Sequence, residues 1–247
     1  KPATGDPIVD PTQDIVLGCY FATTISEGAK GEGKIFSSEE EAVLAWDFKV
    51  VDLQARIKVR LPRSEIYGNK DLPAGVSGPV PAGESGYEII ETSVGRMLFN
   101  RSLPEDFPYV NQLLKKRDLA DIVAKVIKKY GISEAPRVLD KIKTFGFEYA
   151  TRSGISWGID DLVIPQEKPG LIKIAEEKVS QILDHFHRGL LTDKERYDRI
   201  VEVWQGVVDK ITKLVPDAMD RTDPIYTMVD AKARGSWTQI RQRSGMK

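Results

Sequence analysis

The spacing of apolar residues changes along the chain, and this change predicts how the fold is organised. From Leu53 to Leu61 apolar and polar residues alternate, which predicts a strand with one buried face. From Tyr109 onward apolar residues recur every three or four positions, as in amphipathic helices. The sequence therefore predicts an α+β fold that is mostly α-helical, with a mixed α/β part followed by a long antiparallel helical hairpin.

Shorter patterns fill in the first part of the chain. Residues 14–23 are apolar enough for a buried helix or a buried strand, and periodicity does not separate the two. Ser38 is expected to cap a short helix over residues 39–46. Repeated Gly and Pro over residues 62–87 predict a long loop, and residues 88–99 predict a strand that turns sharply at Gly95 into a short helix.

Two longer helices follow. The first is predicted over residues 109–130, with Gly131 as its C-terminal cap. Ser133 and Pro136 open the second. The buried face of the second helix is predicted to consist of Val138, Leu139, Ile142, Phe145 and Tyr149.

The hairpin is predicted in a second domain, residues 165–247, after a first domain over residues 1–164. Its first helix has an apolar stripe, and Thr192 with Glu195 forms a capping box that starts the second. The stripes are Ile172, Ala175, Val179, Ile182 and Phe186 on the first helix, and Tyr197, Ile200, Val201, Trp204, Val208, Ile211 and Leu214 on the second. The exposed tip of such a hairpin is either structural or a docking post for a protein.

Composition narrows the class of protein. The net charge of −1 excludes a chain that binds nucleic acid through its overall charge, so any such contact needs a local basic patch. The single cysteine, Cys19, excludes an internal disulfide and fits a reducing cytoplasm. No apolar run is long enough to span a membrane. The absence of a leader and of an initiator Met suggests a piece of a longer protein.

The end of the chain is basic, because no acid follows Asp230. The basic residues there are Lys232, Arg234, Arg241, Arg243 and Lys247. With neighbouring hydroxyls and amides, they suit either a polyanion or simple solvation. No metal site is expected, because His185 and His187 lie far from Cys19 in sequence and the adjacent Asp160 and Asp161 point apart.

A series of motifs runs along the whole chain in one order. They are residues 10–20 (DPTQDIVLGCY), 92–96 (TSVGR), 109–112 (YVNQ), 146–154 (GFEYATRSG), 158–165 (GIDDLVIP) and 230–242 (DAKARGSWTQIRQ). The series resembles the beta-prime subunit of bacterial RNA polymerase, the largest subunit of that enzyme. The last motif resembles the F-loop, which borders the nucleotide-addition site in that family.

The resemblance implies that residues 1–164 form a pore domain and residues 165–247 a funnel domain with the rim helices of the secondary channel. The implied function is transcription by a nucleotidyltransferase with Mg²⁺, whose aspartate-rich metal motif does not occur in this sequence. The chain alone is therefore expected to be inactive. The implied partners are the beta, alpha, omega and sigma subunits, template DNA, nascent RNA, nucleoside triphosphates and Gre-type factors of the secondary channel, with no membrane.

The resemblance also assigns roles to residues. Arg234 matches the arginine that contacts the triphosphate of the incoming nucleotide. The others fall into three groups: Arg241 and Gln242 support the F-loop, Gln13 and Asp14 line the pore under the RNA 3′ end, and Arg188, Asp193, Tyr197 and Arg199 form the regulator-docking tip. Lys232 departs from the family, which usually has Gly there. The alternative function is a non-catalytic helical scaffold that docks protein partners.

Overall fold

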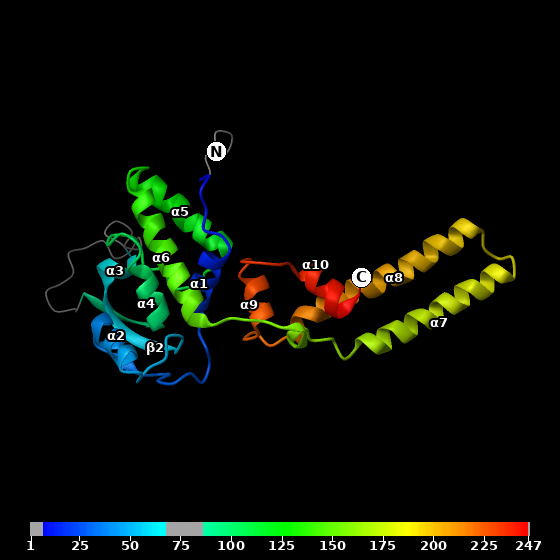
Figure 1. The fold of residues 1–247 in the computed structure, drawn as a ribbon, viewed down its shortest axis with the longest axis horizontal. Helices are drawn as coiled ribbons and strands as arrows, with labels where there is room; N and C mark the ends of the chain where they lie inside the picture. The colour runs from blue at the N-terminus through cyan, green and yellow to red at the C-terminus, as the bar shows by residue number, and fades with distance from the viewer. Residues whose placement is uncertain (1–6, 68–85, 247) are drawn as a thin grey trace. The chain divides into compact units, whose positions relative to one another are not determined.

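The computed structural model describes residues 7–67 and 86–246. The chain divides into two compact units, Lys1–Ile155 and Ser156–Lys247 (Figure 1). The first unit combines helices with a small sheet and the second is helical, so the predicted α+β, mostly helical class is confirmed. The domain boundary between residues 164 and 165 stays a prediction.

The sheet of the first unit has three strands in the order β1 (Ile35–Phe36), β2 (Ile57–Pro62) and β3 (Tyr87–Thr92). β1 runs parallel to β2, and β3 runs antiparallel with Ile57 opposite Thr92. Ile57, Val59 and Leu61 are buried, so the predicted alternation is confirmed.

The strand begins at Ile57, four residues later than predicted from the alternation, because the preceding residues form a turn. In this turn the Ala55 amide donates to the Asp52 carbonyl over 3.1 Å, and the Gln54 side-chain amide donates to the Phe21 carbonyl over 2.6 Å. The buried face of the sheet packs against α2 (Glu39–Asp47) and α4 (Val94–Asn100). The Ser38 hydroxyl caps α2 as predicted, by accepting a hydrogen bond from the Glu41 amide.

Residues 14–23, ambiguous from the sequence, form the helix α1 (Asp14–Thr23). Two glycines allow α1 to lie against α6 (Ala135–Ser153), since a Cβ built on Gly18 would lie 1.8 Å from the Gly146 carbonyl oxygen. A Cβ on Gly95 would lie 1.8 Å from the Ala22 carbonyl oxygen. The predicted sharp turn at Gly95 is therefore wrong: Gly95 lies within α4 and permits the contact of this helix with α1.

Two other predicted boundaries also change. The helix that was expected to begin at Tyr109 is α5 (Lys116–Tyr130), which begins seven residues later. Val110 is not helical because its backbone forms two hydrogen bonds with the Asn100 side chain, at 2.8 and 3.0 Å. Gly131 ends α5 with a φ of 81°, as predicted. A loop was predicted over residues 62–87, and this is wrong for Arg63–Tyr67, which form the helix α3. Residues 68–85 of the predicted loop lie outside the described part of the chain.

The buried face of α6 agrees with its predicted pattern. Val138, Ile142, Phe145 and Tyr149 are buried, and Leu139 is half-buried. Pro136 lies in the first turn of the helix, where its missing N–H removes no helical hydrogen bond.

The second unit contains the predicted hairpin, α7 (Lys168–His187) and α8 (Asp193–Ala218). The capping box at its turn is confirmed, because the Thr192 hydroxyl accepts from the Glu195 amide over 3.3 Å and the Glu195 carboxylate accepts from the Thr192 amide over 2.9 Å. The unit also has a short 3-10 turn, Ile159–Asp161, then α9 (Pro224–Asp230), α10 (Trp237–Ile240) and a π-helical turn, Arg241–Gly245.

Burial in the hairpin is concentrated at its base. Ala175, Val207, Ile211 and Val215 form a buried cluster there. The predicted stripe of α8 is therefore partly wrong: Val207 and Val215 are buried, whereas Tyr197 and Val201 near the tip are 64% and 47% exposed.

The contact between α1 and α6 yields a stability prediction. We expect Gly18→Ala to lower the free energy of unfolding by about 3 kcal/mol, because its Cβ would meet backbone rather than a movable side chain. Chemical denaturation followed by circular dichroism measures the change. Gly206→Ala is the control, since nothing lies within 4 Å of its Cβ position in α8. We expect this substitution to raise the free energy of unfolding by at most about 1 kcal/mol, because alanine is the better helix former. Equal stability of both variants would contradict the close helix packing.

Candidate functional site

The loop after α9 is held in a defined shape by its own backbone. The amides of Ala233 and Arg234 both donate to the Met228 carbonyl, over 3.1 and 3.2 Å. Lys232 and Gly235 have positive φ angles of 56° and 80°, which let the chain reverse direction twice within four residues. As a result Ala233 is buried against the unit while the neighbouring Arg234 side chain is exposed.

Lys232 is the residue in this loop with an unfavourable backbone conformation. A φ of 56° suits glycine and is strained for a residue with a Cβ. Glycine, which the family resemblance led us to expect at this position, would adopt this φ without strain. The loop therefore keeps a glycine-like backbone at this position and adds a positive charge beside Arg234.

Trp237 anchors the segment that follows. The Ser236 hydroxyl caps α10 by accepting from the Gln239 amide over 3.3 Å. The indole of Trp237 lies 5.4 Å from the Tyr226 ring in an edge-to-face arrangement, and it contacts both the hairpin cluster and a second cluster around α9. Trp237 thus holds the loop between two apolar clusters.

A pocket of about 540 Å³ opens beside the loop, within the second unit. Arg234 and Gln242 line it, as do Gln239 and Arg243, which the sequence analysis did not assign to a site. Its apolar lining comes from Trp157, Leu162, Ile225, Met228, Val229 and Ile240. Guanidinium and amide donors above an apolar wall are suited to an anion with a planar or apolar portion.

Arg241 does not line this pocket. Its side chain is half-buried, and its Nε–H lacks a hydrogen-bond partner within the described residues. The turn that carries it packs closely on α8, because a Cβ on Gly245 would lie 2.7 Å from the Ile211 side chain. The Arg241 Nε–H is thus a buried donor without a partner among the described residues, which is uncommon in folded proteins.

Gln13 and Asp14 lie in the first unit, at the N-terminus of α1. Gln13 has a φ of 51°, an uncommon conformation for this residue type, and its carbonyl accepts from the Leu17 amide over 3.0 Å. Asp14 occupies the first turn of α1, where a carboxylate is favoured by the helix dipole. Strained residues of this kind cluster at functional sites, which is the structural reason to retain Gln13 as a candidate.

The tip of the hairpin gathers the remaining four candidates. Arg188 ends α7 and Asp193 starts α8, and both are exposed together with Tyr197 and Arg199. Asp193 pairs with Arg196 at 2.7 Å, and the Arg196 guanidinium stacks over the Phe186 ring at 4.6 Å. Hydrogen bonds from Thr192 lower the pKa of Glu195 and keep the capping box ionised. The tip is therefore an ordered surface.

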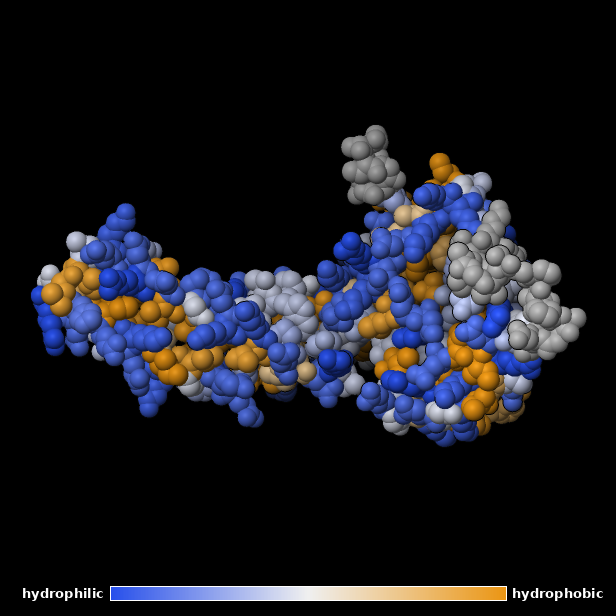
Figure 2. Space-filling model, turned by 180° about the vertical axis from the view of Figure 1, so that it is seen from behind, coloured by the Kyte–Doolittle hydropathy of each residue, from blue (hydrophilic) through white to orange (hydrophobic). Residues whose placement is uncertain are grey.

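Apolar side chains also reach the surface near this tip. Figure 2 shows hydrophobic patches along the hairpin among the charged residues. Leu190 in the turn is 67% exposed, and Tyr197 and Val201 continue the exposed apolar surface on α8. Exposed aromatic and aliphatic residues beside arginine are the composition of protein contact surfaces.

The acids and histidines that the structure describes do not form a metal site. No group of three or more His, Cys, Asp or Glu side chains gathers among residues 7–67 and 86–246. Asp161 caps its own turn by accepting from the Gly158 amide over 2.6 Å. Cys19 is buried, and burial raises the pKa of its thiol. None of the helices within the described residues combines the length and the apolar character needed to cross a membrane.

Comparison with known proteins assigns the family. Residues 1–162 match the family described as RNA polymerase Rpb1, domain 3. The whole chain is 39% identical to the DNA-directed RNA polymerase subunit beta′ of Thermoanaerobacter sp. (strain X514), of which it covers 21%. It is 39% identical to the same subunit of Roseiflexus sp. (strain RS-1), covering 18%, and 41% identical to that of Heliobacterium modesticaldum, covering 20%, again over the whole chain.

The chain thus spans about a fifth of the length of these relatives. The matches cover both compact units, and they confirm the resemblance drawn from the sequence motifs. The chain belongs to the RNA polymerase Rpb1, domain 3 family.

Proposed function

We propose that this chain is the part of a DNA-directed RNA polymerase beta-prime subunit that forms the wall and rim of the secondary channel and carries the F-loop. The observation that carries the proposal is the similarity to beta-prime subunits along the whole chain. The enzyme would make RNA on a DNA template from nucleoside triphosphates, in the cytoplasm. Its partners would be the beta, alpha, omega and sigma subunits, template DNA and nascent RNA.

Arg234 would act on the triphosphate of the incoming nucleotide. It is exposed on a loop whose backbone is held by the Ala233 and Arg234 amides at the Met228 carbonyl, so the side chain extends from a defined backbone position. Negative charge develops on the leaving pyrophosphate during nucleotide addition, and a preorganised donor lowers the energy of that state. Gln242 and Arg243 in the same pocket would add further donors.

Arg241 and Gln242 would support the moving parts of the active site. The π-helical turn that carries the half-buried Arg241 packs on the hairpin base, and Arg241 would brace this turn. Gln13 and Asp14 would line the pore near the RNA 3′ end.

The hairpin would dock Gre-type factors. Its tip is ordered by the capping box and exposes Arg188, Tyr197 and Leu190. A scaffold that only docks protein partners is the second candidate function, and the same exposed tip favours it. Loss of nucleotide addition in loop variants distinguishes the two, because a docking scaffold has no use for Arg234.

The proposed reaction uses Mg²⁺, but residues 7–67 and 86–246 offer no site for the ion. The described residues bring no cluster of acids or other metal-binding side chains together. We therefore propose that the Mg²⁺ ligands belong to segments outside residues 1–247, and that this chain contributes positioning and charge.

The first prediction about function concerns Arg234. In a whole polymerase that contains this chain, we expect Arg234→Ala to slow single-nucleotide addition by about a hundredfold, by analogy with the loss of one preorganised donor. Rapid-quench kinetics on stalled elongation complexes measures the rate. Arg234→Lys should restore part of the rate, because an ammonium keeps the charge and lacks the planar fork.

Lys232→Gly is the matched control for this experiment. It removes a neighbouring positive charge while glycine readily adopts the φ of 56°. We expect its addition rate to stay within about threefold of the unchanged enzyme, since it removes only a flexible exposed charge. If Arg234→Ala and Lys232→Gly have equal effects, general loop charge rather than a specific contact is responsible.

The second prediction concerns the hairpin tip. We expect the double substitution Arg188→Glu and Asp193→Lys to weaken factor-stimulated RNA cleavage by about tenfold and to leave elongation nearly unchanged, because rim charges set association. A transcript-cleavage assay with a Gre-type factor measures the effect. Glu202→Lys, an exposed charge reversal in the middle of α8, is the control. Equal loss of cleavage and elongation would assign a structural role to the tip.

The third prediction concerns the isolated chain. We expect residues 1–247 to give no primer extension with template, nucleoside triphosphates and Mg²⁺, because the described residues form no metal site. A gel-based extension assay tests this, with the whole polymerase as the positive control. Template-dependent extension by the pure chain would overturn the assignment of the metal ligands to other segments.

A further inference from the structure

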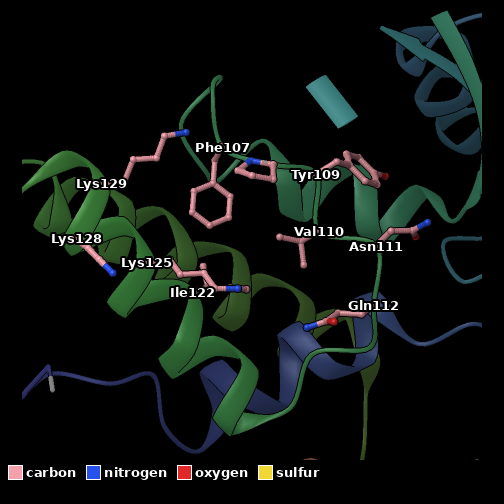
Figure 3. Close-up of a pocket in the computed structure, with 10 residues that line it drawn as sticks. Phe107, Tyr109, Val110, Asn111, Gln112, Ile122, Lys125, Lys128 and Lys129 are labelled. Atoms are coloured by element: carbon pink, nitrogen blue, oxygen red, sulfur yellow. The ribbon is translucent and has the colours of Figure 1, made fainter. Parts of the chain in front are cut away.

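A second pocket lies within the first unit, away from every residue assigned a role above. It has a volume of about 580 Å³ and lies between α5 and the extended segment 107–112 (Figure 3). Phe107, Val110 and Ile122 supply its apolar lining. Figure 3 shows Phe107 and Val110 pointing from the segment toward α5. The pocket therefore has an apolar floor formed by α5 and by the segment that leads into it.

Three lysines from α5 form one side of the pocket. Lys125, Lys128 and Lys129 are exposed, and their spacing of three and four residues places them on one face of the helix. Lys129 is engaged locally, since its ammonium donates to the Asp106 carbonyl over 2.6 Å and lies 3.4 Å from the Asp106 carboxylate. Neither Lys125 nor Lys128 has a hydrogen-bond or ion-pair partner within the described residues.

The helix dipole accounts for part of this arrangement. Lys128 and Lys129 lie in the last turn of α5, where positive charges are favoured by the unpaired carbonyls. It does not account for Lys125 one turn earlier, nor for an apolar pocket beside the three ammonium groups. Like charges on one helix face repel each other, so an anion beside Lys125 and Lys128 would lower the electrostatic energy of the site.

We propose that this pocket, the α5 pocket, binds an acidic peptide segment of another protein chain, with one apolar side chain inserted between Phe107, Val110 and Ile122 and flanking carboxylates on Lys125 and Lys128. A peptide satisfies both halves of the pocket, because one residue fills the apolar floor while its neighbours reach the lysines. This inference rests on the pocket alone and is independent of the proposed role in nucleotide addition.

The geometry favours a peptide over a compact polyphosphate. Many phosphate sites add to their basic side chains the N-terminal end of a helix or a glycine-rich turn, where several amides point at one anion. The α5 lysines lie instead at the C-terminal end, whose carbonyls repel a concentrated negative charge. Carboxylates spread along a peptide can each approach one ammonium and keep away from those carbonyls.

The test uses a fluorescent pentapeptide with a central leucine between two pairs of glutamates, added to the full chain. We expect saturable binding with a Kd below about 1 mM, a modest affinity for so small a ligand. Amide chemical-shift changes should be confined to residues 107–112 and 122–129. Lack of saturation, or shift changes elsewhere, would overturn the proposal.

Two matched variants test the lysines. Lys125→Glu with Lys128→Glu should weaken binding by about tenfold or more, because both charge contacts become repulsive. Lys116→Glu with Arg117→Glu makes the same change of net charge in the first turn of α5, outside the pocket, and should alter the Kd by less than about twofold. Circular dichroism of each variant verifies the fold. Equal weakening by both pairs would show non-specific attraction and would reject the site.

Two further probes separate the classes of ligand. A pentapeptide with glycine in place of the leucine should bind at least about fivefold more weakly, since it loses the burial of one apolar side chain. Sodium triphosphate should compete poorly. Binding of triphosphate at the same amides, more tightly than the leucine peptide, would identify a phosphate site and overturn the peptide assignment.

Discussion

The first unit depends on the backbone-to-backbone packing of α1. This helix touches α6 through Gly18 and Gly146 and touches α4 through Gly95, and none of these contacts leaves room for a Cβ. Such close approach brings three helices to one place, so the position of α1 determines what surrounds it. The glycines are therefore positional requirements, unlike the glycines of exposed turns.

Hydrogen bonds at the C-terminal end of α1 connect this helix to the rest of the unit. The Thr23 carbonyl accepts from the Arg96 guanidinium over 3.0 Å, and the Thr23 hydroxyl accepts from the Leu114 amide over 3.1 Å. Arg96 also donates to the Asn111 side chain over 3.0 Å. These bonds hold the extended segment before α5, so the wall of the α5 pocket is fixed by the same helix that presents Gln13 and Asp14 at its other end.

In the second unit the elements are held together by buried side chains instead of by glycine contacts. A helical hairpin buries little of its own surface, and here its buried residues lie at the base. Trp237 joins that base to the cluster around α9, which fixes the loop carrying Arg234. One tryptophan thus couples the stability of the hairpin base to the shape of the candidate nucleotide-binding loop, while the side chains at the tip are exposed.

The sequence by itself determined the features that depend on neighbouring residues. The α+β class, the hairpin with its Thr192 capping box, the cap at Gly131 and the buried face of α6 follow from periodicity and local hydrogen bonding. The colinear motifs also gave the family, which the comparisons confirmed.

The tertiary structure decided whatever depends on contacts between distant residues. Residues 14–23 form a helix that packs closely on α6 where Gly18 meets Gly146, a contact that no local pattern encodes. The delayed start of α5 follows from the pairing of Val110 with Asn100, and the absence of a side chain on Gly95 permits the contact of α4 with Ala22. In the sequence, the lysines of α5 look like the solvated face of a helix. The pocket beside them becomes visible only in the structure, where residues 107–112 lie next to α5. Local patterns specify the elements, whereas close packing and long-range hydrogen bonds select their ends and create the cavities between them.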